Sequence, residues 1–372
     1  MYIKSVILKD YRNYKNLFIE FNENVNLIIG PNGQGKTNIV ESISLMSIGR
    51  SFRTSKDKEL IRFGCESLYS SCSFNKRNLD KKIEIIIQKD KKGIKVNGVS
   101  IKSIQELLGN LNVVVFSPED LRLVKDGPKE RRTFIDKEIS QIMPRYYNIL
   151  TSYNKILNQR NKLLKSYNID YNLLDVYDQS MADFGSEIYV IRNKFIKKLA
   201  NISNNMHKNL TSGVEELKIK YRNQIKFDDD NYDIGEVKNK ILELMLENRE
   251  HDCQTRTTKI GPHKDDLGIY INDIDVRLYG SQGQQRTASI SLKLSEVELI
   301  KQEVGDYPVL ILDDVFSELD QNRQKMLIDK LENIQMFVTS ADPLHKHILS
   351  KNKYTIFNID KGEIVKIENG GK

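Results

Sequence analysis

The sequence predicts an α/β fold interrupted by a mainly helical segment. Two observations predict it. Short apolar runs typical of buried strands occur in the first and last thirds of the chain, together with helical spacings. Between them, over residues 128–250, apolar residues recur mostly at helical spacing and strand signals are few. We therefore expect one α/β domain, split into residues 1–127 and 251–372, with residues 128–250 as an inserted helical lobe.

Composition bounds the class of protein. The 372 residues are 39% hydrophobic and 29% charged, as in a globular chain of two or three domains. A net charge of +7 allows a nucleic acid or an anionic membrane as partner but requires neither. Cys65, Cys72 and Cys253 form no CxxC pair, so neither a zinc site nor a disulfide framework is expected. Charges between Lys4 and Arg12 and the lack of a long apolar run predict a cytoplasmic protein without signal peptide or membrane span.

The elements before the helical lobe follow from apolar runs and turn signals. The segment Lys36–Ile48 has helical spacing and stops at Gly49. Asn97-Gly98 marks a tight hairpin turn, and Ser117-Pro118 has the composition of a helix start. The predicted strands are Val25–Ile29, Lys82–Gln88, Ile94–Ile101 and Leu111–Phe116.

Strand and helix signals alternate again after Gly261. Within the helical lobe, only Leu217–Tyr221 has a clear strand pattern. The elements predicted after the lobe are strands Leu267–Ile271, Pro308–Leu312 and Met336–Val338 and helices Gln284–Glu303 and near Gln321–Leu331.

A complete phosphate-binding motif follows the strand Val25–Ile29. It consists of Gly30, Pro31, Asn32, Gly33, Gln34, Gly35, Lys36 and Thr37, and matches G-x-x-x-x-G-K-[ST]. Its glycines let backbone N–H groups converge on phosphate oxygens at a helix N-terminus, where Asn38 follows. We expect ATP here, with Lys36 on the β- and γ-phosphates and the Thr37 hydroxyl on Mg²⁺. The alternative is a glycine-rich turn that binds nothing.

A second motif supports the first. The apolar run from Val309 ends in Asp313 and Asp314. In a parallel sheet this places Asp313 beside the phosphate loop, where it holds Mg²⁺, while Asp314 orients or deprotonates the attacking water. We therefore expect Lys36 and Asp314 as catalytic residues and Thr37 and Asp313 as metal residues. The alternative for Asp314 is a solvated acid at a strand end.

A third motif resembles the signature of the ABC-type ATPase superfamily. Ser281-Gln282-Gly283-Gln284-Gln285 precedes a long predicted helix, and Ser317-Glu318-Leu319-Asp320 resembles the D-loop. The resemblance implies an ABC-type P-loop ATPase head with an inserted mainly helical lobe. It also implies that Ser281, Gly283 and Gln284 contact the nucleotide of a second subunit, so that ATP closes a homodimer and hydrolysis opens it.

Within this superfamily the chain resembles the RecF family of bacterial recombination and gap-repair proteins. A transporter subunit has a smaller insert, and an SMC-type head has hundreds of heptad-patterned residues between its halves. The segments that carry the resemblance are Leu8–Tyr14, Pro118–Asp136, Gly261–Asp266 and Leu312–Asp320. Gln282 departs from the glycine of many ABC proteins, but only its backbone is needed.

The RecF resemblance implies a set of functions. These are ATP-dependent dimerisation, binding of double-stranded or gapped DNA without sequence specificity, and slow ATP hydrolysis. They also include cooperation with RecR and RecO in loading the recombinase and in maintaining replication forks. Asp314 stands where transporters usually carry Glu, and its shorter side chain fits a slow, switch-like ATPase.

The sequence allows two roles for each of several other residues. Arg12 either contacts the nucleotide or is a solvated surface residue. Arg131 and Arg132 either pair with acids inside the fold, which we favour, or touch DNA phosphates. His263 is expected in a turn or in packing rather than in catalysis.

The DNA surface is predicted on the helical lobe, near Tyr153 and Phe195, as a basic stripe that binds phosphates without reading bases. The alternative for each residue is an ordinary solvated helix face. The candidates are Lys155, Arg160, Lys162, Lys165, Arg192, Lys194, Lys197 and Lys198. The leading hypothesis is an ATP-switched DNA-binding protein. The alternative is an SMC- or transporter-like head that acts on a protein partner without binding DNA.

Overall fold

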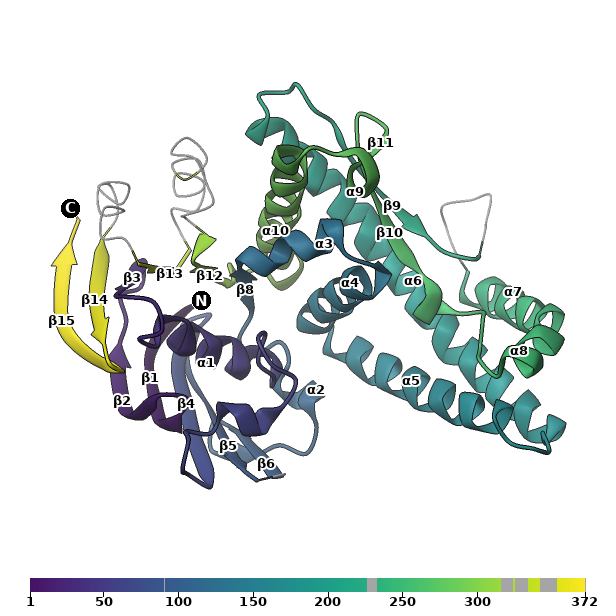
Figure 1. The fold of residues 1–372 in the computed structure, drawn as a ribbon, viewed down its shortest axis with the longest axis horizontal. Coiled ribbons are helices and arrows are strands. Elements are labelled where there is room, and N and C mark those ends of the chain that lie inside the picture. The colour runs from purple at the N-terminus through teal and green to yellow at the C-terminus, as the bar shows by residue number, and fades with distance from the viewer. Residues whose placement is uncertain (90, 226–232, 316–323, 325–333, 342–352, 372) are drawn as a thin grey trace. The chain divides into compact units, whose positions relative to one another are not determined.

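The computed structural model describes residues 1–371 except 90, 226–232, 316–323, 325–333 and 342–352 (Figure 1). The chain forms two compact units. One, called the α/β unit below, comprises residues 1–120 and 296–372; the other, called the helical unit, comprises residues 121–295.

Two six-stranded sheets build the α/β unit. The first is antiparallel, in the order β2-β1-β4-β5-β6-β7. Its strands are β1 (Tyr2–Tyr11), β2 (Tyr14–Glu20), β4 (Ser67–Lys76), β5 (Leu79–Gln88), β6 (Lys91–Val96) and β7 (Val99–Ser100). The short helix α2 (Ile104–Leu107) follows it in the chain.

The second sheet has the order β15-β14-β3-β13-β12-β8 and is parallel except for β15. Its strands are β3 (Val25–Ile29), β8 (Val113–Phe116), β12 (Val309–Asp313), β13 (Met336–Ser340), β14 (Tyr354–Asp360) and β15 (Glu363–Gly370). Because neighbouring parallel strands end at the same edge, residues that follow β3, β12 and β13 meet there.

Helix α1 (Lys36–Ile48) packs against both sheets, contacting β4 and β5 of one and β8, β12 and β13 of the other. Nearly every residue of the helix is buried, as expected for a helix covered on more than one side. It ends at Gly49, whose φ of 72° places it in the left-handed region that terminates helices.

The helical unit is built around the long helix α6 (Tyr171–Leu210), beside which α5 (Pro144–Leu164) and α7 (Ile234–Glu247) pack (Figure 1). A three-stranded antiparallel sheet, in the order β11-β10-β9, completes it. The remaining elements are α3 (Arg122–Lys125), α4 (Pro128–Ile142), α8 (Arg249–Thr255), α9 (Val276–Tyr279), β9 (Leu217–Arg222), β10 (Asp266–Ile271) and β11 (Ile274–Asp275). Helix α10 (Gln282–Val304) begins in this unit and ends in the other. None of the helices in the described parts of the chain is long and apolar enough to cross a bilayer.

The structure confirms most predicted elements to within a few residues. The hairpin at Asn97-Gly98 is present, with both residues at positive φ. The helix expected to start at Ser117-Pro118 is present: its first turn, Pro118–Leu121, is 3₁₀, and it continues directly as α3 (Arg122–Lys125). The Ser117 N–H donates to the Asp120 carboxylate at this start. The predicted helix near 321–331 lies outside the described residues apart from Gln324, and the proposed D-loop, 317–320, lies wholly outside them.

The helical unit reaches beyond the predicted lobe of residues 128–250. Strand β10 pairs with β9 from Leu267↔Tyr221 to Ile271↔Leu217, so residues after 250 pack with the lobe. Compact units are defined by packing, not by function, and the division of the ATPase domain into 1–127 and 251–372 stays a prediction.

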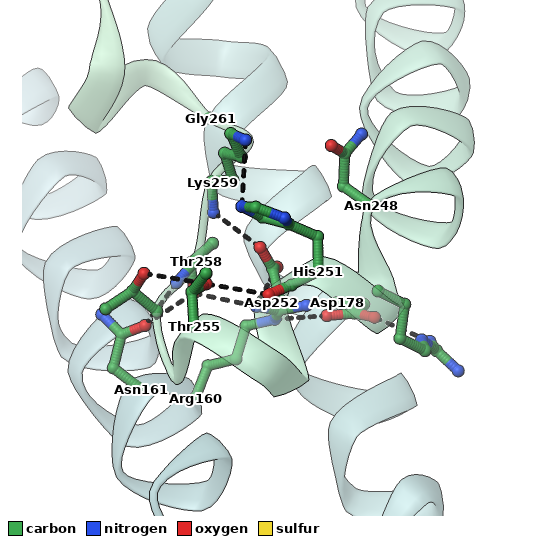
Figure 2. Close-up of polar contacts among 12 residues, drawn as sticks. Arg160, Asn161, Asp178, Asn248, His251, Asp252, Thr255, Thr258, Lys259 and Gly261 are labelled. Atoms are coloured by element: carbon green, nitrogen blue, oxygen red, sulfur yellow. Dashed lines mark hydrogen bonds and ion pairs between the residues drawn. The ribbon is translucent and has the colours of Figure 1, made fainter.

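A buried ion network joins α5, α6 and α8 (Figure 2). Arg160 is completely buried, and its guanidinium donates to Asp178 (2.6 Å), Asp252 (2.7 Å) and the Thr258 hydroxyl (2.9 Å). Burial raises the pKa of Asp252, an effect that Arg160 opposes. The hydroxyl of Thr258 in turn donates to Asn161. Arg249 of α8 donates to the other oxygen of Asp178 at 2.7 Å. The network therefore joins three helices, with Arg160 as its fully buried cation.

We expect Arg160→Ala to lower the free energy of unfolding by about 3–5 kcal/mol, because it leaves the buried carboxylate of Asp252 without its cation, while Asp178 keeps Arg249. Urea unfolding followed by circular dichroism measures the change. The matched control is Lys162→Ala, which removes an exposed cation from the same helix and should stay within about 0.5 kcal/mol of the wild type. Equal effects of the two substitutions would contradict a stabilising role for the network.

Candidate nucleotide-binding site

The phosphate loop lies between β3 and α1, at the carboxyl edge of the parallel sheet. Gly30 opens it beside strand β14, where a Cβ would stand 2.1 Å from the Ile359 carbonyl oxygen. Only glycine fits this close approach. Pro31, Asn32 and Gly33 are exposed, whereas Gly35 and Lys36 are buried. The loop therefore presents its tip to solvent and keeps its base inside the fold.

Lys36 is folded back into its own loop. Its ammonium donates to the carbonyl oxygens of Gly30 (2.7 Å) and Pro31 (3.0 Å). Burial lowers the pKa of Lys36, and the nearby carboxylates of Asp314 and Asp313 oppose this effect. The lysine is thus a partly desolvated cation beside two acids, at the point where the motif places phosphates.

One oxygen of Asp313 accepts two hydroxyl hydrogen bonds. Thr37, on α1, donates to Oδ1 at 3.0 Å, and Thr339, on β13, donates to the same atom at 2.6 Å. Burial raises the pKa of Asp313, and the two hydroxyls partly offset this. Thr37 and Asp313 together offer the oxygen ligands that Mg²⁺ prefers. The described residues contain no group of three or more His, Cys, Asp or Glu that could hold a metal alone, so further ligands would come from phosphate and water.

Asp314 adopts a left-handed backbone conformation with φ 53°. Its N–H donates to the Thr339 hydroxyl at 3.0 Å, so Thr339 fixes both acids of the motif. Aspartate tolerates this conformation better than most residues.

Side chains of the turn between β1 and β2 form hydrogen bonds with the phosphate loop and the start of α1. Asn13 donates to the Gln34 carbonyl (2.9 Å) and accepts from the Asn38 amide (2.8 Å), while the Tyr14 hydroxyl donates to the Gly35 carbonyl (3.1 Å). Gly35 has a φ of 111°, and a Cβ there would stand 2.6 Å from the Asn13 amide nitrogen. Sequence reasoning missed these braces, although Asn13 and Tyr14 close the segment Leu8–Tyr14 that resembles the family.

Arg12 is neither a solvated surface residue nor free to move. Its guanidinium pairs with the fully buried Glu41 of α1 at 2.7 and 3.0 Å and donates to the Glu59 carbonyl at 2.7 Å. Ser51 also donates to Glu41. The surface alternative is therefore wrong, and a nucleotide contact by Arg12 stays a prediction. Glu41 had no motif that could have identified it.

The signature residues lie in the helical unit at the start of α10. Ser281 and Gln284 form a reciprocal cap: the Gln284 N–H donates to the Ser281 hydroxyl (3.2 Å), and the Ser281 N–H donates to the Gln284 side chain (3.0 Å). The Gln284 amide nitrogen donates to Glu215 at 2.9 Å, so its side chain is held at both ends. Ser281, Gln282 and Gly283 are exposed.

Two of the predicted DNA contacts are wrong. Arg160 is buried in the network described above, and Arg192 is 2% exposed and pairs with Asp136 and Asp265. Tyr153 and Phe195 are buried too and offer no face for stacking. Of the remaining candidates Lys197 is half-buried; the exposed ones are Lys155, Lys162, Lys165, Lys194 and Lys198.

The structural alternatives for Arg131 and His263 are confirmed. Arg131 pairs with Asp266 at 2.6 Å inside the helical unit. Arg132 donates to the backbone carbonyl of Asp265 at 2.6 Å, so its predicted partner in the fold is present as a carbonyl and not as an acid. His263 sits in a 3₁₀ turn and contacts the Tyr153 hydroxyl at 2.7 Å. Burial lowers its pKa to about 4, so it is neutral at pH 7 and serves packing.

These features define a P-loop ATPase: a loop after a parallel strand, a helix that starts with Lys36 and Thr37, and a carboxylate from a nearby strand. The signature residues at the start of α10 place it in the ABC type. Comparison with known proteins agrees. Residues 2–363 match the model of the RecF/RecN/SMC N-terminal domain. The head domain of an SMC protein, solved with the C-terminal winged-helix domain of ScpA, has a TM-score of 0.58 at 15% identity and covers 100% of this chain and 98% of its own; it supports the fold alone.

Closer relatives define the family. The DNA replication and repair protein RecF of Clostridioides difficile strain 630 is 62% identical over 371 residues, which cover 100% of both chains. A solved structure described as the recombination mediator protein RecF-ATP in the RecFOR pathway has a TM-score of 0.91 and 38% identity, covering 100% of this chain and 98% of its own. The chain belongs to the RecF family of DNA replication and repair proteins, which confirms the resemblance seen in the sequence.

Thr339 provides a test of this site, because it holds both acids without belonging to any motif. We expect Thr339→Val to cost about 1–3 kcal/mol of unfolding free energy, since it removes a donor from Asp313 and an acceptor from the Asp314 N–H. We also expect weaker binding of Mg²⁺-ATP in calorimetric titration. Thr339→Ser keeps the hydroxyl and should resemble the wild type in both measurements. Similar results for Val and Ser would show that the hydroxyl does not position the acids.

Proposed function

We propose that this chain is an ATP-dependent DNA-binding protein of recombinational and gap repair and of replication-fork maintenance. Two copies share the bound ATP and Mg²⁺, close on double-stranded or gapped DNA, and release it after slow hydrolysis. RecR and RecO are the proposed partners in loading the recombinase. The single observation that carries the proposal is the meeting of Thr37 and Asp313 beside Lys36.

The residues of the loop fit Mg²⁺-ATP. The Lys36 ammonium donates to loop carbonyls, interactions that it can exchange for β- and γ-phosphate oxygens, and polyphosphate would also compensate its desolvated charge. Thr37 and Asp313 would hold the metal ion, which supplies positive charge to the phosphates. The N–H groups of the loop and of the first residues of α1, from Gly33 to Thr37, add donors for the phosphates, while that of Asn38 donates to the Gly35 carbonyl.

The signature loop supports a site shared between two copies. Gly283 is the second residue of α10, and glycine forms helices less readily than alanine. Its φ is not positive, and the atom nearest to an added Cβ would be the Ser281 hydroxyl oxygen, 3.9 Å away. The fold of the chain itself therefore does not require glycine here. Close approach of a ligand from outside, such as the γ-phosphate held by a second copy, gives a reason for it.

Asp314 is the proposed residue for hydrolysis. It follows the metal-binding Asp313 directly, and the Thr339 hydroxyl fixes its backbone. From there its carboxylate would orient or deprotonate water for attack on the γ-phosphate. Because its side chain is one methylene shorter than that of glutamate, we infer a slow ATPase that acts as a switch.

Two observations support DNA as the substrate: the family of the chain and its positive net charge. The relatives are named as DNA replication and repair proteins, and a structural neighbour is named as a mediator of the RecFOR pathway. The net charge of +7 suits a polyanionic partner bound through its backbone. Such binding fits the lack of any sequence-reading motif.

ATP-driven dimerisation is testable by light scattering. We expect Ser281→Arg to abolish the rise in mass on adding ATP, because the arginine would obstruct the exposed loop that meets the second nucleotide, while monomeric ATP binding persists. The matched control is Ser166→Arg, on an exposed turn of the same unit, which should still dimerise. Dimerisation of Ser281→Arg with ATP would contradict a shared site.

DNA binding is testable by fluorescence anisotropy of a labelled gapped duplex across a salt series. We expect affinity to rise with ATP, to fall steeply with salt, and to be lost in part in Lys36→Met, which cannot neutralise the phosphates of ATP. If the wild type with ATP leaves the anisotropy unchanged even at low salt, DNA is not a direct partner, and the protein-directed alternative takes its place.

A further inference from the structure

Hydrogen bonds within the helical unit connect the exposed signature loop to the buried end of α6. The Gln284 side chain is the link: its carbonyl oxygen accepts from the Ser281 N–H at 3.0 Å, and its amide nitrogen donates to Glu215 Oε1 at 2.9 Å. Glu215 lies in the turn between α6 and β9. Its other oxygen, Oε2, is 3.2 Å from Nε2 of His207, in the last turn of α6. Three side chains in contact thus lead from the helix to the loop.

His207 fixes one end of this path. Its side chain is completely buried, and its Nδ1 is 3.0 Å from the Ser291 hydroxyl of α10. That hydroxyl donates to the Thr287 carbonyl at 2.8 Å. Because a hydroxyl has one hydrogen, Ser291 accepts from the Nδ1–H of His207, and Nε2 is left to face Glu215. His207 therefore joins α6 to α10 and to the turn that carries Glu215.

The backbone on both sides of Glu215 is also bound to α6 and the residue that follows it. The Thr211 hydroxyl donates to the His207 carbonyl at 2.9 Å and accepts from the Glu215 N–H at 3.4 Å. Two residues further on, the Leu217 N–H donates to the Asn204 side chain at 3.2 Å. The carboxylate of Glu215 is therefore presented from a backbone that is held in place.

Both oxygens of the Glu215 carboxylate have a partner, and the side chain is 20% exposed. The carboxylate cannot rotate without breaking one of these hydrogen bonds. A free glutamine side chain samples many rotamers, and restricting it costs conformational entropy. Because Glu215 holds the amide of Gln284, that restriction is already present in the folded chain.

Gln284 lies where the packed part of the unit meets its exposed loop. Ser281, Gln282 and Gly283 are exposed, whereas the Gln284 side chain is half-buried. The Gln284 N–H donates to the Ser281 hydroxyl, so both the backbone and the side chain of Gln284 contact Ser281. The orientation of Gln284 therefore sets the orientation of Ser281.

We propose that Glu215, held by His207, is a positioning residue for the signature loop. Through Gln284 it keeps Ser281 in the geometry that receives the γ-phosphate of the ATP bound to a second copy. The inference rests on the proposed shared site and gives a role to Glu215 and His207, which belong to no motif. Ordering the loop in advance raises affinity, because less freedom is lost when the two copies close.

The test measures ATP-driven dimerisation by light scattering over a series of protein concentrations. Glu215→Ala removes the acceptor of the Gln284 amide, and Glu215→Gln keeps an oxygen for it. The matched control is Glu216→Ala, which removes the neighbouring carboxylate, paired with Lys208 at 3.6 Å and Lys218 at 3.5 Å. Each full-length variant is also compared with the wild type in thermal unfolding and, at concentrations below dimerisation, in calorimetric titration with ATP.

We expect Glu215→Ala to need about 25-fold more protein for half-dimerisation, which is about fivefold for each of the two signature loops in a symmetric dimer. Glu215→Gln and Glu216→Ala should dimerise like the wild type. Binding of ATP to the monomer should be unchanged in all three variants, because none of them alters the phosphate loop.

A double-mutant cycle separates positioning from a general loss of stability. Gln284→Ala should weaken dimerisation by itself, and adding Glu215→Ala should weaken it no further, because Glu215 then has no amide to hold. A loss of stability would add to the effect of Gln284→Ala. Additive effects of the two substitutions would therefore overturn the proposal.

Two other results would overturn the proposal and leave the shared site intact. One is that Glu215→Ala dimerises like the wild type while Ser281→Arg does not; the other is that Glu216→Ala loses as much as Glu215→Ala. If the wild type itself does not dimerise with ATP, the shared site fails and the role of Glu215 fails with it.

Discussion

The hydrogen bonds from Thr37 and Thr339 to one oxygen of Asp313 hold the candidate site together. They join the start of α1 to the ends of β12 and β13, which lie side by side in the parallel sheet. Burial makes the Asp313 carboxylate costly to ionise, so its two donors and any metal ion bound beside it stabilise the form that can act as a ligand. Because Thr339 also accepts from the Asp314 N–H, the same hydroxyl orients both acids.

Helix α1 transmits constraints from several parts of the α/β unit to this point. Its start is braced by Asn13 and Tyr14, its middle by the pair of Arg12 with Glu41, and its end by Lys92 on the Gly49 carbonyl. These contacts come from the antiparallel sheet and its connections, whereas the motif acids come from the parallel sheet. Contacts from both sheets therefore hold helix α1 in place.

The parts of the site that are encoded in consecutive residues could be predicted from the sequence. The phosphate loop, the acidic strand and the helix that follows the signature are encoded in consecutive residues, so strand Val25–Ile29 and helix Lys36–Ile48 have the predicted bounds. Features that depend on distant partners were missed or wrong. Arg160 was expected on the surface but pairs with Asp252, 92 residues away, and Thr339 reaches Asp313 across 26 residues. Strand β4 was not predicted because its serines, of which Ser70 and Ser71 are buried, hide the apolar alternation.

We propose that ATP, bound at a site shared by two copies, controls DNA binding. Sedimentation velocity of a labelled gapped duplex with the protein tests it most directly, because mass gives the number of chains on each DNA. We expect two chains per duplex with ATP and little bound protein without it, and a single chain or none for Ser281→Arg with ATP. A complex of the same mass with and without ATP, or one unaffected by Ser281→Arg, would contradict the claim.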